Sequence, residues 1–178
     1  MVVAVDDAYL VGAARGGDTD AFEELVRRHQ DPMFRLALRM TGSRADAEEA
    51  AQDGFVDAWR SLAQYRGDAS FRAWLARIVT RRCLDVVAAR RPTVELPPVL
   101  EQPGGDVGAR AEERDRLRAL VEAVLALPPD ARAALVLREF QGLSYAEVAE
   151  ALGASLPAVK GRIHRARLEL AAMMEGWR

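Results

Sequence analysis

The residues best suited to recognise another molecule lie near the C-terminus, in the segment LSYAEVAEALGASLPAVKGRIHRAR of residues 143–167. Within it, Ala149, Gly153 and Val159 follow the pattern A-x3-G-x5-V. A small alanine lets two helices cross closely, a glycine permits a tight turn, and a valine fills the core that the helices share. This spacing is typical of a helix-turn-helix, whose second helix lies in the major groove of DNA.

The second helix of this segment combines small residues with long cations. Ser155 is a suitable N-cap, and Pro157 is tolerated in the first helical turn. We expect a buried stripe formed by Leu156, Val159, Ile163, Ala166 and Leu170. The candidate DNA-binding residues are Ser155, Pro157, Ala158, Lys160, Gly161, Arg162, His164 and Arg165. Small residues allow a close approach to the groove, and cations can reach phosphates and guanine edges.

A simpler interpretation of the same cations stays open, because the charged face of a packed helix is usually only solvated. The A-x3-G-x5-V spacing and the small residues Ala158 and Gly161 favour the groove-binding interpretation. His164 fits a phosphate contact and an ordinary surface position equally well.

A helix predicted from Ser43, its N-cap, to Leu62 carries an acidic stripe. Its buried face is predicted to contain Ala47, Ala51, Phe55, Ala58 and Leu62. Four carboxylates at intervals of 3, 4 and 4 form a separate stripe that faces away from this core: Asp46, Glu49, Asp53 and Asp57. Such a stripe is either solvated or opposes a basic partner surface.

A third helix follows the turn YRGDA of residues 65–69 and is rich in arginine. Between residues 72 and 91, six arginines stand against one acid, Asp85. The net charge of the whole chain is only −2, but this sum conceals the cationic helix and the acidic stripe. Charge is therefore distributed unevenly along the chain.

Composition predicts an all-α fold. Half of the 178 residues are hydrophobic, and the alternating pattern typical of strands is nearly absent. Residues 92–109 contain four prolines and three glycines, which are incompatible with a regular helix. We therefore expect two small helical domains joined by a flexible, acidic Pro/Gly-rich linker, with a helix-turn-helix in the C-terminal one. The helix of residues 21–42 is expected to be interrupted near Pro32 and to end at Gly42.

Several functional classes have no support in the sequence. One cysteine, Cys83, and two histidines cannot form a zinc cluster, and Cys83 is expected to be a buried structural thiol. We find no glycine-rich phosphate loop, no catalytic triad and no metal-ligand set, so we expect neither an enzyme nor a cofactor. The N-terminus does not resemble a signal peptide, and no apolar run approaches the roughly 20 residues of a membrane span. A cytoplasmic protein without membrane insertion or a small-molecule substrate is expected.

Three runs taken together resemble a bacterial sigma factor: DAEEAAQDGFVDAWRSL, YRGDASFRAWLARIVTRRCLD and LPPDARAALVLREFQGLSYAEVAEALGASLPAVKGRIHRARLEL. They are most similar to the small, two-domain extracytoplasmic-function (ECF) subfamily of the sigma-70 family. The match is ordered and covers about residues 18–172. A sigma factor is not an enzyme, since it lends promoter recognition and strand opening to core RNA polymerase.

The resemblance implies a division of the chain into an N-terminal extension, sigma region 2, a linker and sigma region 4, at residues 1–17, 18–91, 92–112 and 113–178. Region 2 of the family docks on the clamp helices of core polymerase and captures the minus-ten element of the promoter. Region 4 reads the minus-thirty-five element. The implied partners are therefore core polymerase, through its clamp helices and flap, and promoter DNA, with an anti-sigma factor as the expected regulator.

The resemblance also assigns residues to these tasks. The residues implied in polymerase docking are Asp46, Glu49, Gln52, Asp53 and Asp57. The residues implied in recognition of the minus-ten element are Tyr65, Arg66, Asp68, Phe71, Arg72, Arg77, Arg81 and Arg82. Aromatic side chains can stack on unpaired bases and arginines can hold a single-strand backbone. Phe71 and Trp74 are expected mainly in the core, which leaves Tyr65 as the better stacking candidate, and Arg165 is the candidate for a guanine contact.

Three departures from the family pattern stand out. Gly54 occupies a position where relatives usually have a larger residue, and Arg81 one where many carry a base-contacting Asn. Pro157 and Ala158 stand where relatives often have Gly and Thr. The linker acids lie where relatives thread the chain past the RNA exit path, although an ordinary solvated linker explains them equally well.

Two competing functions remain. A freestanding transcription factor would bind duplex DNA without polymerase, but it would need a dimer interface or a sensor segment, and neither is evident. A helical adaptor that binds only proteins would tolerate charge reversal at Lys160, Arg162 and Arg165.

Overall fold

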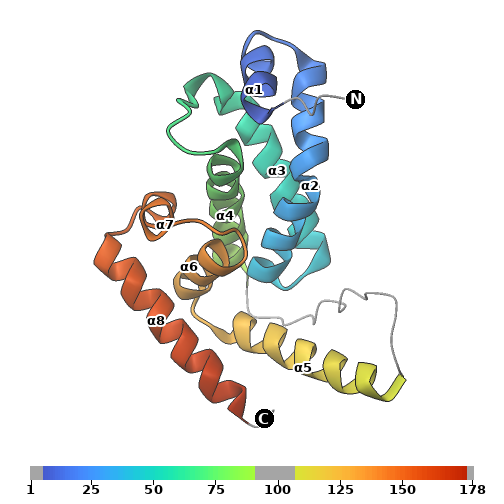
Figure 1. Ribbon diagram of the computed structural model, residues 1–178, viewed down its shortest axis with the longest axis vertical. Helices are drawn as coiled ribbons and strands as arrows, with labels where there is room; N and C mark the ends of the chain where they lie inside the picture. Colours follow the sequence, from blue (N-terminus) through green and yellow to red (C-terminus); the bar gives the residue numbers. More distant parts are fainter. Residues whose placement is uncertain (1–5, 91–106, 176–178) are drawn as a thin grey trace.

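The computed structural model describes residues 6–90 and 107–175, and every regular element in these ranges is a helix (Figure 1). The elements are α1 (Asp7–Arg15), α2 (Thr19–Thr41), α3 (Arg44–Ser61), the 3-10 helix η1 (Leu62–Gln64), α4 (Phe71–Ala89), α5 (Val107–Ala126), α6 (Pro129–Glu139), α7 (Tyr145–Leu152) and α8 (Leu156–Met173). The predicted all-α class is confirmed. None of these helices is long and apolar enough to cross a membrane.

The first module is a bundle of α1–α4 in which α2, α3 and α4 pack against one another. Serine or aspartate caps begin its three long helices, since the side chains of Asp18, Ser43 and Ser70 each accept a hydrogen bond from a backbone N–H in the first turn. The core of this module is closed by fully buried side chains that include Leu25, Met33, Leu36, Met40, Leu75 and Val79. The caps explain where the three long helices begin, and the buried side chains explain why they pack together.

The predicted interruption near Pro32 is wrong, because α2 continues through this residue to Thr41. Proline lacks the N–H that would bond to the carbonyl of Arg28. Met33 and Leu36 in the following turn are fully buried, so tertiary packing holds the helix together across the missing bond. The predicted end is confirmed, since Gly42 adopts a left-handed conformation with φ 70°.

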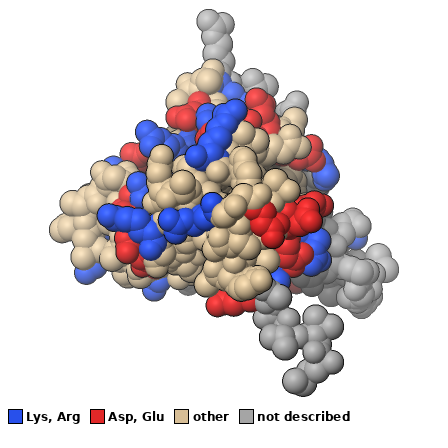
Figure 2. All heavy atoms as spheres, turned by 90° about the horizontal axis from the view of Figure 1, so that it is seen from above, with Lys and Arg blue, Asp and Glu red and all other residues tan. Residues whose placement is uncertain are grey.

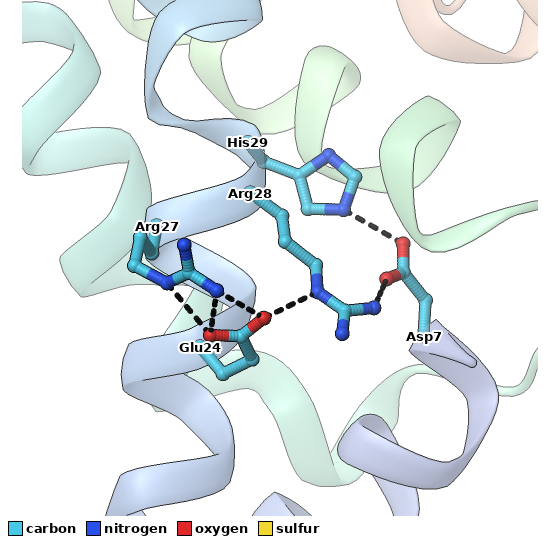
Figure 3. A network of polar contacts seen from close by, with 5 residues as sticks. All are labelled: Asp7, Glu24, Arg27, Arg28 and His29. Atoms are coloured by element: carbon cyan, nitrogen blue, oxygen red, sulfur yellow. Dashed lines mark hydrogen bonds and ion pairs between the residues drawn. The ribbon is translucent and has the colours of Figure 1, made fainter. Parts of the chain in front are cut away.

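Helix α1 lies within the predicted N-terminal extension and packs on α2. Its Asp7 carboxylate accepts a hydrogen bond from His29 Nε2 at 2.7 Å and another from Arg28 at 3.2 Å (Figure 3). Arg28 also bonds to Glu24, which joins α1 and α2 in one polar network. The His29 ring packs edge-on against Phe71 at 5.4 Å between centroids, so α1 supports the start of α4.

The second module is formed by α5–α8, with α6 and α7 packed on α8. Pro129 stands in the first turn of α6, a position where a missing backbone N–H costs nothing. Helix α5 begins at Val107, so the part of the predicted linker after residue 106 is helical, whereas residues 92–106 lie outside the described ranges. The reason is local: the chain after Gly108 reads ARAEERDRLRAL, a run of strong helix formers without proline.

The two modules pack against each other, which the sequence did not indicate: α2 contacts α5 and α6, and α4 contacts α6 and α7. Arg132 of α6 is buried and donates to the Met40 carbonyl at 2.5 Å and to the carbonyls of Leu125 and Leu127. The end of α2 also packs closely against α5 at this place. A Cβ at Gly42 would lie only 2.8 Å from Leu125 Cδ1.

Gly54 has a structural role at the crossing of α3 and α4. It is buried in a regular helix, and a Cβ there would lie 2.6 Å from Val79 Cγ2 and 3.3 Å from Val79 Cα. The absence of a side chain therefore lets the two helices approach, and the departure from the family pattern at this position does not break α3.

We expect Gly54→Ala to lower the free energy of unfolding by up to about 2 kcal/mol. Overpacking a core costs typically ~1–3 kcal/mol, which outweighs the gain in helix propensity of roughly 1 kcal/mol. Urea denaturation of the two proteins measures the difference. Gly12→Ala is the matched control, because a Cβ at Gly12 in α1 meets nothing within 4 Å. Equal stabilisation by both substitutions would contradict the close crossing of α3 and α4.

Candidate nucleic-acid interface

Helices α7 and α8 form the predicted helix-turn-helix. Ser144 and Glu147 make a reciprocal capping box at the start of α7, and Gly153 ends the helix with φ 58°. The Ser155 hydroxyl accepts a hydrogen bond from the Ala158 N–H at 3.3 Å and so caps α8. Val159 is fully buried between the helices. The geometry that the A-x3-G-x5-V spacing predicts is therefore confirmed.

The outer face of α8 contains most of the predicted DNA-binding residues in exposed positions. Ser155, Pro157, Ala158, Lys160, His164 and Arg165 are exposed, and Gly161 and Arg162 are half-buried. The predicted buried stripe is confirmed at Val159, Ile163 and Ala166, and Leu170 packs against the core. It is wrong at Leu156, which is 40% exposed because it is the first residue of the helix and precedes the first buried position.

The cations of α8 differ in how firmly the protein holds them. Arg162 forms an ion pair with Asp130 of α6 at 3.2 Å, which draws it toward the module. Lys160 Nζ lies 5.9 Å from the centre of the Tyr145 ring. Arg165 is exposed and forms no ion pair with any residue in the described ranges, and its guanidinium lies beside Gly161. Arg165 is therefore the cation best placed to contact a ligand.

The residues predicted to capture an unpaired base lie around the start of α4. The Tyr65 hydroxyl donates to the Ala69 carbonyl at 2.5 Å, and its ring lies 5.1 Å from Trp74 and 6.1 Å from Phe71 between centroids. Desolvation raises the pKa of Tyr65, with smaller contributions from the charges of Asp7 and Asp68. Phe71 is buried and Trp74 is half-buried against the core, as expected. Tyr65 is half-buried in the same aromatic cluster.

Three of the four predicted backbone cations of α4 bond to other parts of the protein. Arg72 donates to the Gln141 side chain at 3.2 Å, and Arg77 pairs with Glu150 at 3.0 Å, so both reach across to the second module. Arg82 pairs with Asp57 of α3. Arg81 is exposed and makes no ion pair with a described residue. Arg66 and Asp68 in the preceding loop are exposed and pair with each other at 3.0 Å.

A groove runs between the two modules at this surface, with a volume of about 950 Å³. Its walls come from the loop of residues 65–69, from α4 and from the end of α7. Arginines 77, 81 and 82 contribute cations to it, and Trp74 and Ile78 contribute apolar surface. In the space-filling view a group of cations and a group of acids lie beside each other on one face (Figure 2). The groove mixes chemistry that suits bases with chemistry that suits phosphates.

The acidic stripe of α3 differs from the prediction. Asp46 pairs with Arg90 and Asp57 pairs with Arg82, so two of the four carboxylates face α4 instead of pointing away from the core. The physical reason is that α3 and α4 pack side by side, so long arginines of one helix reach acids of the other. The sequence contains a signal for this pairing. Two acids of one helix, Asp46 and Asp57, are 11 residues apart, and two arginines of the next helix, Arg82 and Arg90, are 8 residues apart.

The remaining docking candidates form a continuous exposed surface on α3. Glu49, Gln52 and Asp53 are exposed. Beside them lie two exposed apolar side chains, Val56 at 46% and Trp59 at 39%. Exposed aromatic and aliphatic groups flanked by charge are typical of a protein-binding surface. Sequence reasoning did not single out Val56 and Trp59 for this role.

Two family descriptions match the chain in order. The family described as Sigma-70 region 2 matches residues 25–93, and the one described as Sigma-70, region 4 matches residues 117–170. The first range includes most of α2 together with α3 and α4, and the second includes α6, α7 and nearly all of α8. The matched ranges therefore contain every predicted site residue.

Known proteins of the same kind match over most of the chain. The ECF RNA polymerase sigma factor SigE of Mycolicibacterium smegmatis is 40% identical over 84% of this chain, which spans 60% of that relative's length. SigM of Mycobacterium tuberculosis is 37% identical over 94% of this chain and 84% of its own length. Among solved structures, CnrH in complex with the cytosolic domain of CnrY superposes with a TM-score of 0.72 and 32% identity, over 96% of this chain and 97% of the other. The chain therefore belongs to the ECF group of sigma-70 family RNA polymerase sigma factors.

Proposed function

We propose that this protein binds core RNA polymerase and directs it to begin transcription at specific promoters. The observation that carries the proposal is the ordered match of region 2 and region 4 to two modules that each expose a candidate recognition surface. In this function the chain supplies binding and positioning, whereas the polymerase carries out the chemistry. It acts in the cytoplasm, where polymerase and chromosome are found.

In this proposal α8 reads the minus-thirty-five element in the major groove. The small residues Ala158 and Gly161 leave room for the helix to approach base edges. Arg165, exposed and without an ion pair in the described ranges, contacts a guanine, while Lys160 and His164 contact phosphates. Arg162 contributes less, because Asp130 already neutralises part of its charge.

The start of α4 and the preceding loop capture the minus-ten element. Tyr65 stacks on an unpaired base and Arg81 holds the strand backbone, since both border the same groove. Arg72 and Arg77 are engaged by Gln141 and Glu150 in the packed chain. The N–H groups that these partners occupy become available to DNA when the second module moves away from α4, so promoter binding favours separation of the modules.

Core polymerase docks on α3. Glu49, Gln52 and Asp53 supply an exposed polar surface for its clamp helices, and Val56 and Trp59 supply apolar contact. Asp46 and Asp57 serve the fold through their ion pairs with α4. The second module contacts the flap of polymerase. An anti-sigma factor is the proposed regulator, in keeping with the complex of CnrH with a cytosolic domain of another protein.

The two competing functions are separated by simple binding measurements. A freestanding regulator would bind a promoter duplex tightly and specifically in a gel shift without polymerase. A protein-only adaptor would retain full activity after charge reversal at Lys160, Arg162 and Arg165. We expect neither result.

Run-off transcription with core polymerase on a library of genomic promoter fragments tests the function directly. We expect defined start sites that require this protein, and we expect Asp53→Lys to weaken polymerase binding at least about tenfold, about 1.4 kcal/mol, because it reverses charge within the docking surface. Glu48→Lys is the control, since Glu48 lies on the same helix but pairs with Arg44 at 2.9 Å. Transcription from no site, or equal loss with both variants, would count against the proposal.

Replacing the proposed guanine contact should reduce sequence discrimination. We expect Arg165→Ala to lower the preference for the native minus-thirty-five element over a mutated one by about 1–3 kcal/mol. Competition binding with holoenzyme measures this preference. Arg167→Ala is the matched control, because Arg167 on the same helix pairs with Glu139 at 2.5 Å. If Arg165→Ala weakens binding to every sequence equally, Arg165 contacts phosphate instead of a base.

A further inference from the structure

Three arginines of the first module meet the second module around a small second pocket. The pocket has a volume of about 290 Å³ and is open to solvent. It is lined by Pro32, Arg35, Arg39, Arg72, Phe140 and Gln141. The first four residues come from α2 and α4, and the last two follow the end of α6. The lining contains three cations and no carboxylate.

Arg39 is the unusual member of this group, because it is a half-buried cation without an acidic partner among the described residues. Its guanidinium lies 4.3 Å from the centre of the Phe140 ring and donates to the Arg35 carbonyl at 3.1 Å. Desolvation lowers the pKa of Arg39, and the neighbouring charge of Arg35 lowers it further. Proteins normally pair partly buried charges, so this site lacks its counter-charge.

The other two arginines leave donors available at the same place. Arg72 uses one N–H for the Gln141 side chain at 3.2 Å, and a guanidinium has five. Arg35 is exposed, and no ion pair joins it to a residue in the described ranges. Both therefore present free N–H donors in the planar arrangement that suits phosphate oxygens.

We propose that this pocket binds a small polyphosphate anion, either free pyrophosphate or the diphosphate group of a nucleotide. Three guanidinium groups match the charge of a diphosphate, whereas a single carboxylate would leave most of them unpaired. The ligand oxygens accept hydrogen bonds from Arg35, Arg39 and Arg72, and Pro32 and Phe140 form the apolar wall beside them.

Binding at this place affects both modules. The anion contacts α2 and α4 on one side and the segment after α6 on the other, so it stabilises the packed arrangement in which Arg72 is bound to Gln141. A ligand that binds only one conformation shifts the population toward it. The anion therefore opposes separation of the modules. The pocket itself requires neither polymerase nor promoter, so its ligand binding is tested independently of the proposed function.

Isothermal titration of the full chain with inorganic pyrophosphate tests the site, with a nucleoside diphosphate and inorganic phosphate titrated in parallel. We expect saturable binding of pyrophosphate that Arg39→Gln weakens at least about tenfold, the loss of one charge-assisted contact. Arg35→Gln is the second variant, because this exposed side chain can be replaced with little effect on folding. Arg60→Gln is the matched control, since it removes one exposed cation of α3 outside the pocket.

Thermal unfolding provides a second readout. Pyrophosphate should raise the unfolding temperature of the native protein and of Arg60→Gln, and it should raise that of Arg35→Gln and Arg39→Gln much less. Tighter binding of the nucleoside diphosphate than of pyrophosphate would support the site and identify a nucleotide as its ligand; equal or weaker binding would identify free pyrophosphate.

Three results would overturn the proposal. The first is the absence of saturable pyrophosphate binding. The second is an equal loss of affinity in Arg60→Gln, which would show only diffuse attraction by net positive charge. The third is a loss of promoter affinity in Arg35→Gln and Arg39→Gln without any pyrophosphate binding, which would make these arginines contacts to the DNA backbone.

Discussion

The arrangement of this protein depends on one buried cation, Arg132, at the junction of its modules. Its guanidinium donates to the Met40 carbonyl in the last turn of α2 and to the Leu125 and Leu127 carbonyls where α5 meets α6. Burial lowers the pKa of Arg132, but an arginine stays charged in proteins, so the site must supply negative potential. The carbonyl end of α2 does so, because unpaired carbonyls there carry the negative end of the helix dipole. This contact holds the second module against the first.

The packed arrangement explains how a slightly acidic chain can present cations for DNA. Acids of α3 and of the second module neutralise part of the positive charge of α4, as the pairs Asp57–Arg82 and Glu150–Arg77 show. Arg165 and Arg81 remain unpaired among the described residues, on separate modules. Arg77, whose partner Glu150 belongs to the second module, is also a proposed contact to the promoter strand. In the proposed function, recognition of the promoter and separation of the modules are therefore coupled.

The parts of the structure that could be predicted from sequence are those that depend on neighbours in the chain. The helix-turn-helix follows from Gly153 and Val159 at a fixed spacing, and helix ends follow from Ser43, Ser155 and Gly42. The features that were predicted wrongly depend on contacts between residues far apart in the chain. Burial on both sides of Pro32 overrides a local helix breaker, and the partners of Asp46 and Asp57 lie on another helix. The docking of one module on the other depends on Arg132, whose sequence context resembles that of any helical arginine.

The packing of the two modules can be followed by the distance between one label on each of them. Fluorescent labels on Asp20→Cys and Glu169→Cys, both exposed positions on different modules, report this distance by energy transfer. Cys83, the only native cysteine, does not compete for label because it is fully buried and burial raises its pKa to about 12. We predict one narrow distance population in the free protein and a shift to a different distance after core polymerase binds. A broad distribution in the free protein, or a distance that polymerase leaves unchanged, would contradict the account.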